Sequence, residues 1–376
     1  MAERKHVLVV GVLPPPLHGQ SRINEVLVAT LRQRADLRVL DTSPRRLERT
    51  SLYYLHRIAR VLWCLAALAA TAHPRMPSYL SVSSRLGLWL DLCFVLIARV
   101  RGCRLVLHHH TYNYIDERSR AMSILVAAAG ASATHIFACE VMRDQFGSLY
   151  RNAHRTLICS LAIFGDLALE PRRRSVDRGR AFKIGMLSNL TAQKGLRDFL
   201  AVVAEAERRR LPVSGVLAGP VPAKTDRDAI SEAQSQGDGR LSYRGPLYGA
   251  AKDAFFDEID AFLLPTRSES YGLVIIEALS RGVPVIASAC GCIGSYLTAP
   301  AGHAIPPSAA FAETALASIV AWISEPDAYG RASEVALRLG RELRLRSEMD
   351  FSGLVSRIIE DEGASLREGG PGCADA

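Results

Sequence analysis

Short apolar runs alternate with longer helical segments along almost the whole chain, and this alternation constrains the fold more than any other feature. In the first half, we expect strands at 7–10, 37–40, 104–108 and 135–138. Helices are expected at 21–34, near 120–130 and after residue 140, and two apolar helices at 58–72 and 86–100. This alternation predicts a parallel sheet with helices on both faces.

A second alternating unit follows a charged stretch that contains proline and glycine. Its expected strands are 182–187, 213–218, 241–244, 261–265 and 283–287, with helices at 196–210 and from Ala309 and Ala332. We therefore predict two doubly wound α/β domains, over 1–170 and 181–345, facing a cleft and joined by the linker 170–180. A C-terminal helix over 346–362 would pack back on the first domain, and 363–376 would be a disordered tail.

The positive charge lies in the first half of the chain. Residues 1–165 contain 21 Lys and Arg against 10 Asp and Glu, whereas the remainder contains 25 against 28. This asymmetry suits an anionic partner such as an acidic membrane surface, although a solvated basic face without a partner explains it too. No helix-turn-helix, zinc-finger or basic-zipper signature is present, so we do not expect nucleic acid as a partner.

The two apolar helices of the first half allow two interpretations. The uncharged part of 58–72 is shorter than the roughly 20 residues that a membrane-spanning helix needs. Packing against the sheet is the simpler interpretation. The alternative is a peripheral membrane helix whose arginines, Arg45, Arg46, Arg49, Arg57 and Arg60, contact lipid headgroups.

The eight cysteines show neither C-x-x-C pairs nor the spacing of zinc ligands. Most lie in apolar segments, which favours buried free thiols in a reducing compartment. No secretory signal precedes the first strand. We expect a cytoplasmic protein, with a peripheral position on the inner membrane face as an alternative.

Two glutamates, Glu269 and Glu277, flank a turn that follows an expected strand. The first would lie on the loop at the carboxyl end of that strand, where open α/β sheets bind ligands, and the second about two turns into the next helix. Gly272 allows close approach of the backbone, and a helix N-terminus offers N–H groups to an anion. Such a turn would suit a sugar joined to a phosphate.

Two further loops have the character of ligand-binding loops. Lys194 and Gly195 open a helix after the first strand of the second domain, where a lysine can hold a diphosphate. In the first domain, a proline-rich loop with Gly19 follows the first strand. Each of these patterns also occurs as a purely structural turn.

Three adjacent histidines end an expected strand at the edge that faces the cleft. Because side chains alternate along a strand, His108 and His110 should share one side and His109 should point to the other. No acidic or cysteine ligands cluster beside them, so we do not expect a metal site. The Asp226-Arg-Asp228 sequence is interpreted as part of a solvated helix face.

Taken together, these residues resemble the retaining GT-B glycosyltransferases of family four, whose E-x7-E motif matches Glu269–Glu277. The resemblance covers nearly the whole chain and implies two Rossmann-like domains. It implies that Glu269, Lys194 and His110 act in catalysis, and that Gly19 and Gln20 belong to a first-domain glycine loop. The implied donor and nucleotide contacts are Glu277, Asn189, Gly219, Arg244, Tyr271, Gly272, Leu273 and Val274, with Gly245 near the nucleotide pocket.

The chain departs from the family at two positions. Asn189 stands where the family usually has an arginine, so one phosphate-binding cation is missing unless Arg267 or Arg244 replaces it. Ser295 follows the turn after which the family often has a glutamate. Neither departure removes the glutamate pair or Lys194.

The resemblance implies transfer of a sugar from a nucleotide diphosphate-sugar to a glycan or lipid-linked acceptor, as in bacterial surface-polysaccharide synthesis. It implies no cofactor and no metal requirement. A sugar-nucleotide epimerase and a non-catalytic nucleotide-sugar-binding protein are the alternatives. The sequence does not indicate the base, the sugar or the linkage.

Overall fold

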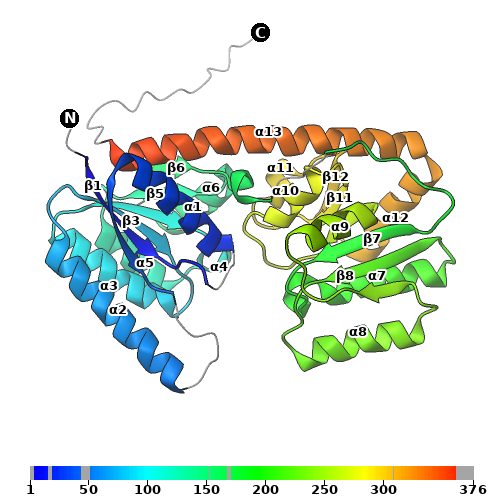
Figure 1. The fold of residues 1–376 in the computed structure, drawn as a ribbon, viewed down its shortest axis with the longest axis horizontal. Coiled ribbons are helices and arrows are strands. Elements are labelled where there is room, and N and C mark those ends of the chain that lie inside the picture. Colours follow the sequence, from blue (N-terminus) through cyan, green and yellow to red (C-terminus); the bar gives the residue numbers. More distant parts are fainter. Residues whose placement is uncertain are drawn as a thin grey trace, which may run out of the picture.

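Two six-stranded sheets, parallel throughout, form the centres of two domains (Figure 1). The computed structural model describes residues 4–15, 19–43, 51–151, 153–166, 171–307 and 309–360, with the side chains of 51–55 left aside. The predicted architecture of two doubly wound α/β domains is confirmed. The predicted tail at 363–376 and the arginines Arg45, Arg46 and Arg49 lie outside the described residues.

The first sheet has the strand order β2-β1-β3-β4-β5-β6. The central strands are buried on both faces, as a parallel sheet covered by two helical layers requires. For example, all six residues of Pro77–Val82 are buried. The strands are β1 (His6–Gly11), β2 (Asp36–Asp41), β3 (Pro77–Val82), β4 (Arg104–His109), β5 (Thr134–Phe137) and β6 (Arg155–Ile158).

The helices of this domain are α1 (Gly19–Arg34), α2 (Ser51–Thr71), α3 (Gly87–Val100), α4 (Asn113–Asp116), α5 (Arg120–Ala129), α6 (Glu140–Leu149) and the 3-10 turn η1 (Ala162–Phe164). After α1 the chain returns to one side of β1, and after α2 it returns to the other. Right-handed crossovers therefore place α1 on one face of the sheet and α2, α3 and α5 on the opposite face. Consistent with this, α3 contacts both α2 and α5.

The second sheet has the order β12-β11-β10-β7-β8-β9. Its strands are β7 (Phe182–Leu187), β8 (Val213–Ala218), β9 (Leu241–Tyr243), β10 (Ala261–Leu264), β11 (Val285–Ser288) and β12 (Gly302–Ile305). Its helices are η2 (Ala192–Lys194), α7 (Leu196–Arg208), α8 (Lys224–Gln236), α9 (Ala250–Glu258), α10 (Leu273–Leu279), α11 (Ile293–Tyr296), α12 (Phe311–Ser324) and α13 (Pro326–Ile359).

The strand order reverses once in each sheet, between β1 and β3 and between β7 and β10. Loops that leave neighbouring strands in opposite directions open a crevice at such a point, and ligands of open α/β sheets bind there. In the second domain these are the loops after β7 and β10, which carry Lys194 and Glu269. The topology therefore brings Lys194 and Glu269 to one place, although they are 75 residues apart in the sequence.

Helix α13 crosses from the second domain to the first (Figure 1). Near its start, the Tyr329 hydroxyl donates to the carbonyl of Asp260 (2.8 Å). Near its end, the Asp350 carboxylate accepts from the Ser160 hydroxyl (2.8 Å), and Arg104 donates to the carbonyls of Arg357 and Ile358. The expectation of separate helices from Ala332 and over 346–362 is wrong, because strong helix formers continue between them.

Several short elements differ from the prediction. Strands β3, β6 and β12 and helix α9 were not expected. Strand β3 begins with a proline and contains Ser78 and Ser81, so it lacks the continuous apolar run by which buried strands are identified. Strands β6 and β12 have four residues each, and the charged Arg155 opens the first of them.

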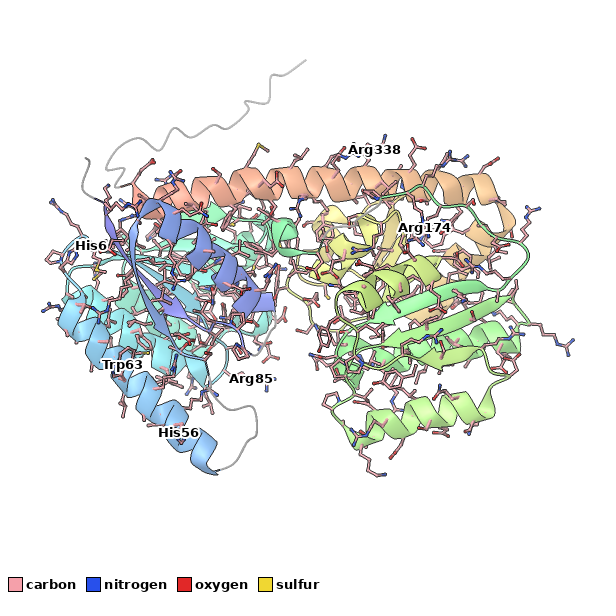
Figure 2. The ribbon with its side chains drawn as sticks, in the orientation of Figure 1. His6, His56, Trp63, Arg85, Arg174 and Arg338 are labelled. Atoms are coloured by element: carbon pink, nitrogen blue, oxygen red, sulfur yellow. A yellow bond between two sulfur atoms is a disulfide. The ribbon has the colours of Figure 1, made fainter. Side chains whose placement is uncertain are left out.

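The charged stretch expected as a linker is anchored on the second domain through Arg174 (labelled in Figure 2). Its backbone N–H donates to the Ser333 hydroxyl (2.8 Å), and its guanidinium donates to the carbonyls of Ile259 (2.9 Å) and Arg281 (3.0 Å). Burial lowers the pKa of Arg174. This segment therefore belongs to the domain that it was expected to precede.

Two of the cysteines are not free thiols, contrary to the prediction. Cys139, which precedes α6, forms a disulfide with Cys292, which precedes α11, and so joins the two domains. The two residues are 153 positions apart, so no spacing in the sequence indicates the pairing. The cysteines at 64, 93, 103, 159 and 290 are free.

Helix α3 carries a buried carboxylate. Asp91 is 5% exposed and accepts hydrogen bonds from the backbone N–H (2.6 Å) and the hydroxyl (3.2 Å) of Ser83, which follows β3. Burial raises the pKa of Asp91 to about 7, against the opposing effect of the two hydrogen bonds. The Asp91 carboxyl group thus fastens the end of β3 to α3, and in the fold it titrates near neutral pH.

This burial predicts a pH-dependent stability that Asp91→Asn removes. Because the folded-state pKa is raised, the contribution of Asp91 is full below its unfolded pKa and is lost as the pH rises to about 7. Between pH 5.5 and 8.5 the wild type should lose roughly 2 kcal/mol relative to the variant, at about 1.4 kcal/mol per pH unit. Urea unfolding of the wild type and of Asp91→Asn at the two pH values measures this loss. If the two proteins differ in unfolding free energy by the same amount at both pH values, the raised pKa of Asp91 is contradicted.

Candidate active site

An ion pair at the switch point of the second sheet forms the centre of the site. The Lys194 ammonium lies 2.8 Å from the Glu269 carboxylate and also donates to the Ser268 carbonyl (3.1 Å). Lys194 ends η2, which the Thr191 side chain caps by accepting from the Lys194 N–H. Both charged side chains are about one-quarter exposed, at 26% and 22%. The pair is therefore ordered by the fold and still open to a ligand.

Loops of the first domain meet this pair. The Ser270 hydroxyl donates to the His110 carbonyl (2.8 Å), which places the end of β4 beside the residue that follows Glu269. On the other side of the turn, Gly19 at the start of α1 lies against Leu273 at the start of α10, because a Cβ on this glycine would lie 3.9 Å from Leu273. The structure thus brings together five predicted site residues from four separate loops, namely Gly19, His110, Lys194, Glu269 and Leu273.

The three histidines divide between the two faces of the sheet, as the alternation predicts. The rings of His108 and His110 lie 4.0 Å apart, centre to centre. His109 points to the other face, where its ring contacts Tyr114 (2.9 Å) and His135 (3.0 Å). Burial lowers the pKa of His108 and of His109 well below the usual value, so both rings are neutral at neutral pH. The contact of this segment with the Glu269 loop is made by the His110 carbonyl.

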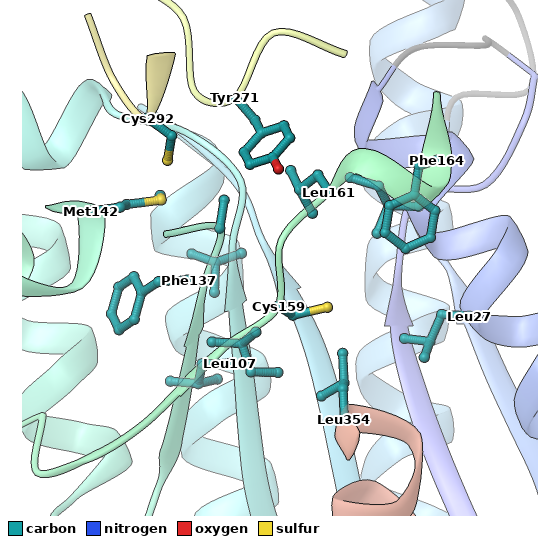
Figure 3. Packing of buried hydrophobic residues seen from close by; sticks show 14 of the residues in the cluster. Leu27, Leu107, Phe137, Met142, Cys159, Leu161, Phe164, Tyr271, Cys292 and Leu354 are labelled. Atoms are coloured by element: carbon teal, nitrogen blue, oxygen red, sulfur yellow. The ribbon is translucent and has the colours of Figure 1, made fainter. Parts of the chain in front are cut away.

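The turn between the two glutamates is shaped by Gly272, whose φ of +78° favours glycine. Tyr271 turns its side chain away from the site into the packing between the domains, near Leu161 (Figure 3). Its carbonyl accepts a hydrogen bond from the Tyr296 hydroxyl. This hydrogen bond anchors the turn formed by Tyr271, Gly272, Leu273 and Val274. Because the Tyr271 side chain points away, the turn presents its backbone to the site.

Glu277 lies on α10, which begins at Leu273, so it stands little more than one turn into the helix and not two as expected. Its side chain is 10% exposed. One oxygen accepts from the Asp166 N–H (3.2 Å) and the other from the Lys252 ammonium (3.1 Å). Burial raises the pKa of Glu277, and Lys252 and the Asp166 N–H oppose that effect. The ionised carboxylate depends on these two donors.

Charged residues that the sequence analysis missed complete this cluster. Lys252, on α9, also pairs with the Asp166 carboxylate. Arg281 is 4% exposed, pairs with Asp253, and donates to the carbonyls of Asp166 (3.1 Å) and Glu277 (2.9 Å). Asp166 comes from the chain that leaves the first domain, so the cluster spans the junction. Nothing in the local sequence of α9 distinguishes Lys252 from a solvated lysine.

A cavity of about 450 Å³ opens between the domains next to Glu269. First-domain residues on its wall include Tyr112, Asp116 and Gln145, and second-domain residues include Arg267 and Cys290. Burial raises the pKa of Asp116, and burial together with Glu269 raises that of the Cys290 thiol to about 11. Cys290 is therefore an uncharged thiol at neutral pH, and the cavity wall combines apolar surface with the ionisable side chains of Asp116, Arg267 and Glu269.

The remaining predicted residues surround this centre. The carbonyl of Gly219, which follows β8, accepts from the Tyr243 hydroxyl (2.8 Å), and its N–H donates to the Gly245 carbonyl (2.8 Å). Gln20 donates to the Ser81 hydroxyl (2.8 Å) at the end of β3. Asn189 is exposed.

Of the two candidate replacements for the missing cation, Arg267 is the better placed. Its backbone N–H donates to the Gln193 carbonyl (2.9 Å), next to Lys194, and its side chain is 67% exposed with only a loose pair to Asp198 (3.7 Å). Arg244 instead pairs closely with Glu258 (2.8 Å), which Lys183 also contacts.

Among the described residues, no group of three or more histidine, cysteine or acidic side chains is arranged to hold a metal ion. Asp226 is 6% exposed, so it does not lie on a solvated face as expected, whereas Asp228 pairs with Lys224 at the surface.

Residues 181–320 match the family model of the glycosyl transferases group 1. The alpha-D-kanosaminyltransferase of Streptomyces kanamyceticus is 22% identical over 234 residues, which cover 56% of this chain and 60% of that protein. The second domain is therefore similar to a glycosyltransferase domain, and the matched part spans less than two thirds of this relative.

Solved structures match over nearly the whole chain. Anabaena HepE in complex with UDP-glucose has a TM-score of 0.67 at 13% identity, covering 93% of this chain and 99% of HepE. The sucrose-phosphate synthase of Thermosynechococcus elongatus has a TM-score of 0.67 at 16% identity, covering 94% and 100%. These similarities establish the GT-B fold.

The buried cluster predicts a large effect of Lys252→Met on stability. Removing this cation leaves the Glu277 carboxylate without its main charge partner, which should cost roughly 3 kcal/mol in urea unfolding. Glu277→Gln in the same background should restore part of the loss.

Lys224→Met is the matched control, because Lys224 forms an exposed pair with Asp228 (2.8 Å). It should change the unfolding free energy by less than about 0.5 kcal/mol. If Lys252→Met and Lys224→Met lower the free energy of unfolding equally, the buried cluster at the junction contributes no more to stability than an exposed ion pair does.

Proposed function

We propose that the protein transfers a sugar from a nucleotide diphosphate-sugar to a glycan or lipid-linked acceptor, with retention of the anomeric configuration. The observation that carries this proposal is the Lys194–Glu269 pair at the switch point of a domain that matches a glycosyltransferase family model. UDP-glucose, the ligand of the HepE structure, suggests that uridine nucleotides are the first donors to test.

The geometry supports a division of roles among the site residues. The leaving diphosphate develops negative charge, which Lys194 and the backbone N–H groups at Gly272 and Leu273 would stabilise. Binding of the phosphates would draw Lys194 away from Glu269 and free the carboxylate to hold sugar hydroxyls. Glu277, already a buried acceptor, would bind the ribose.

Acceptor activation needs no separate carboxylate base in this scheme. A phosphate oxygen of the donor takes the acceptor proton while the glycosidic bond to the diphosphate breaks, and the new bond forms on the same face of the sugar. The cavity beside Glu269 would receive the acceptor, and His110 would orient it or the donor sugar. We propose surface-polysaccharide synthesis as the setting.

Lys194→Ala and Glu269→Ala should each lower the transfer rate by roughly 30- to 1000-fold, the effect of losing about 2–4 kcal/mol of transition-state stabilisation. A thermal-shift screen with nucleotide sugars first identifies the donor, and product analysis with and without acceptor then measures transfer.

Lys224→Ala, on an exposed face of the same domain, is the control and should retain full activity. Near-native turnover of folded Lys194→Ala and Glu269→Ala proteins would refute the site. Conversion of the donor alone, without transfer, would point to an epimerase, and binding without turnover to a sugar-nucleotide-binding protein.

Arg267 should supply the cation that Asn189 does not. Arg267→Ala should weaken binding of the nucleoside diphosphate by roughly 10- to 150-fold, since a hydrogen bond to a charged group contributes about 1.5–3 kcal/mol. Asn189→Arg in that background should recover the affinity.

Arg244→Ala should leave the affinity unchanged, because the Arg244 guanidinium is already paired with Glu258, which Lys183 also contacts. Calorimetric titration with the nucleoside diphosphate measures these affinities in the wild type, Arg267→Ala, Arg267→Ala with Asn189→Arg, and Arg244→Ala. A larger loss in Arg244→Ala than in Arg267→Ala would reverse the assignment.

A further inference from the structure

Exposed apolar side chains gather on one side of the first domain. Fourteen large hydrophobic residues are exposed among those that the structure describes, and eight of them belong to α2, α3 and the residue before α3. Leu86 is 82% exposed, Val100 85% and Trp63 62%. We call this set the α2–α3 face; it consists of Ile58, Leu62, Trp63, Leu86, Trp89, Leu90, Leu96 and Val100.

Helix α2 is apolar on both its sides. Its inner side packs Val61, Cys64 and Leu68 into the core. Its outer side carries Ile58, Leu62 and Trp63, followed by the exposed alanines 66, 69 and 70. An ordinary surface helix would carry charged residues there. The core therefore explains only one side of this helix.

Helix α3 repeats the pattern. Its inner side contributes Leu88, Phe94 and Val95 to the core, while Trp89, Leu96 and Val100 point outward at helical spacing. Helices α2 and α3 contact each other, so their outer sides join into one surface. Figure 1 shows both helices at the edge of the first domain, away from the second sheet, and Figure 2 shows Trp63 on α2 at this edge.

Basic residues predominate around this surface, although Arg60 on α2 is paired with Asp41. Between residues 56 and 103 the chain has six arginines, and its only acidic residue is Asp91, which is buried. Arg57, Arg85 and Arg99 are exposed on or beside the two helices. Basic residues that surround apolar and tryptophan side chains match the interface of an anionic bilayer, where indole rings lie at the headgroups and each arginine adds attraction.

None of the described helices is long and apolar enough to cross a membrane. An interfacial position on one leaflet fits the geometry instead, since both helices remain fixed to the sheet by their inner sides. We propose that the α2–α3 face docks on an anionic lipid bilayer, with Trp63 and Trp89 entering the headgroup region. The inference uses this surface alone and does not depend on the proposed reaction.

Tryptophan fluorescence tests the docking directly, because two of the three tryptophans lie on the face and the third, Trp322, is 6% exposed in the second domain. The full chain with Trp322→Phe is mixed with vesicles of phosphatidylglycerol and phosphatidylcholine at low salt. The expected result is a blue shift, and strong quenching when the phosphatidylcholine carries brominated chains. Pure phosphatidylcholine vesicles should give a much weaker signal.

Paired variants separate the apolar from the charged contribution in vesicle co-sedimentation. Leu62→Ser with Trp63→Ser should weaken partitioning at least about 10-fold. Arg57→Gln, Arg85→Gln and Arg99→Gln together should weaken it on the order of 100-fold, since each arginine near the surface contributes about one decade or less. Each variant has a matched control on α13 that should bind vesicles as the wild type does. The apolar control is Leu345→Ser with Met349→Ser, and the charge control is Arg331→Gln with Arg338→Gln and Arg341→Gln.

Absence of lipid quenching in the Trp322→Phe protein would overturn the proposal. So would a dimer in sedimentation velocity that Leu62→Ser with Trp63→Ser dissociates, combined with no vesicle binding, because the face would then belong to a second copy. If the α13 controls lose as much vesicle binding as the variants of the α2–α3 face, binding depends on net charge or general hydrophobicity and not on this face. That result would also overturn the proposal. All these readouts are independent of donor binding and turnover.

Discussion

The geometry of the molecule depends on a carboxylate that is kept out of water where the two domains join. Glu277 has little contact with solvent, and an unpaired charge in that position would be costly. Lys252 and the N–H of Asp166 meet the requirement from two different parts of the chain. Satisfying one buried charge therefore draws the exit of the first domain, α9 and α10 to a single point. The loops after β4 and β10 meet beside it, which gives the site its two-domain character.

The architecture was accessible from the sequence because it rests on local periodicity. Apolar runs such as β1 and β10 and amphipathic helices such as α7 need no distant partner to be identified. Strand β3 was not identified, because Ser78 and Ser81 become buried only when helices cover both faces of the sheet.

The site was predictable only in part, for a similar reason. Glu269, Lys194 and His110 follow strands whose carboxyl ends the topology brings together. Lys252 owes its role to a carboxylate 25 residues further along, and Cys139 is bonded to a residue 153 positions away. Contacts of this kind are set by how the domains meet, and no local pattern records them.

Two surfaces of the first domain serve different contacts. The side that carries His110 and Gly19 packs against the second domain, while the outer side of α2 and α3 is apolar and basic and lies away from it. The sheet separates them, since strand ends define the first surface and a helical layer the second. If the acceptor has a lipid part, the side with His110 and Gly19 would contact its sugar, and the outer side of α2 and α3 would contact the membrane that holds its lipid.

Helix α13 has a mechanical consequence. It is one unbroken helix of 34 residues, about 50 Å at 1.5 Å per residue, and hydrogen bonds fasten it to the second domain near one end and to the first near the other. A stiff rod attached to both bodies resists shear and separation along its own length. It still permits rotation about its axis. The Cys139–Cys292 disulfide and the Lys252–Asp166 pair oppose that rotation, so α13 and these two links together hold the domains in one arrangement.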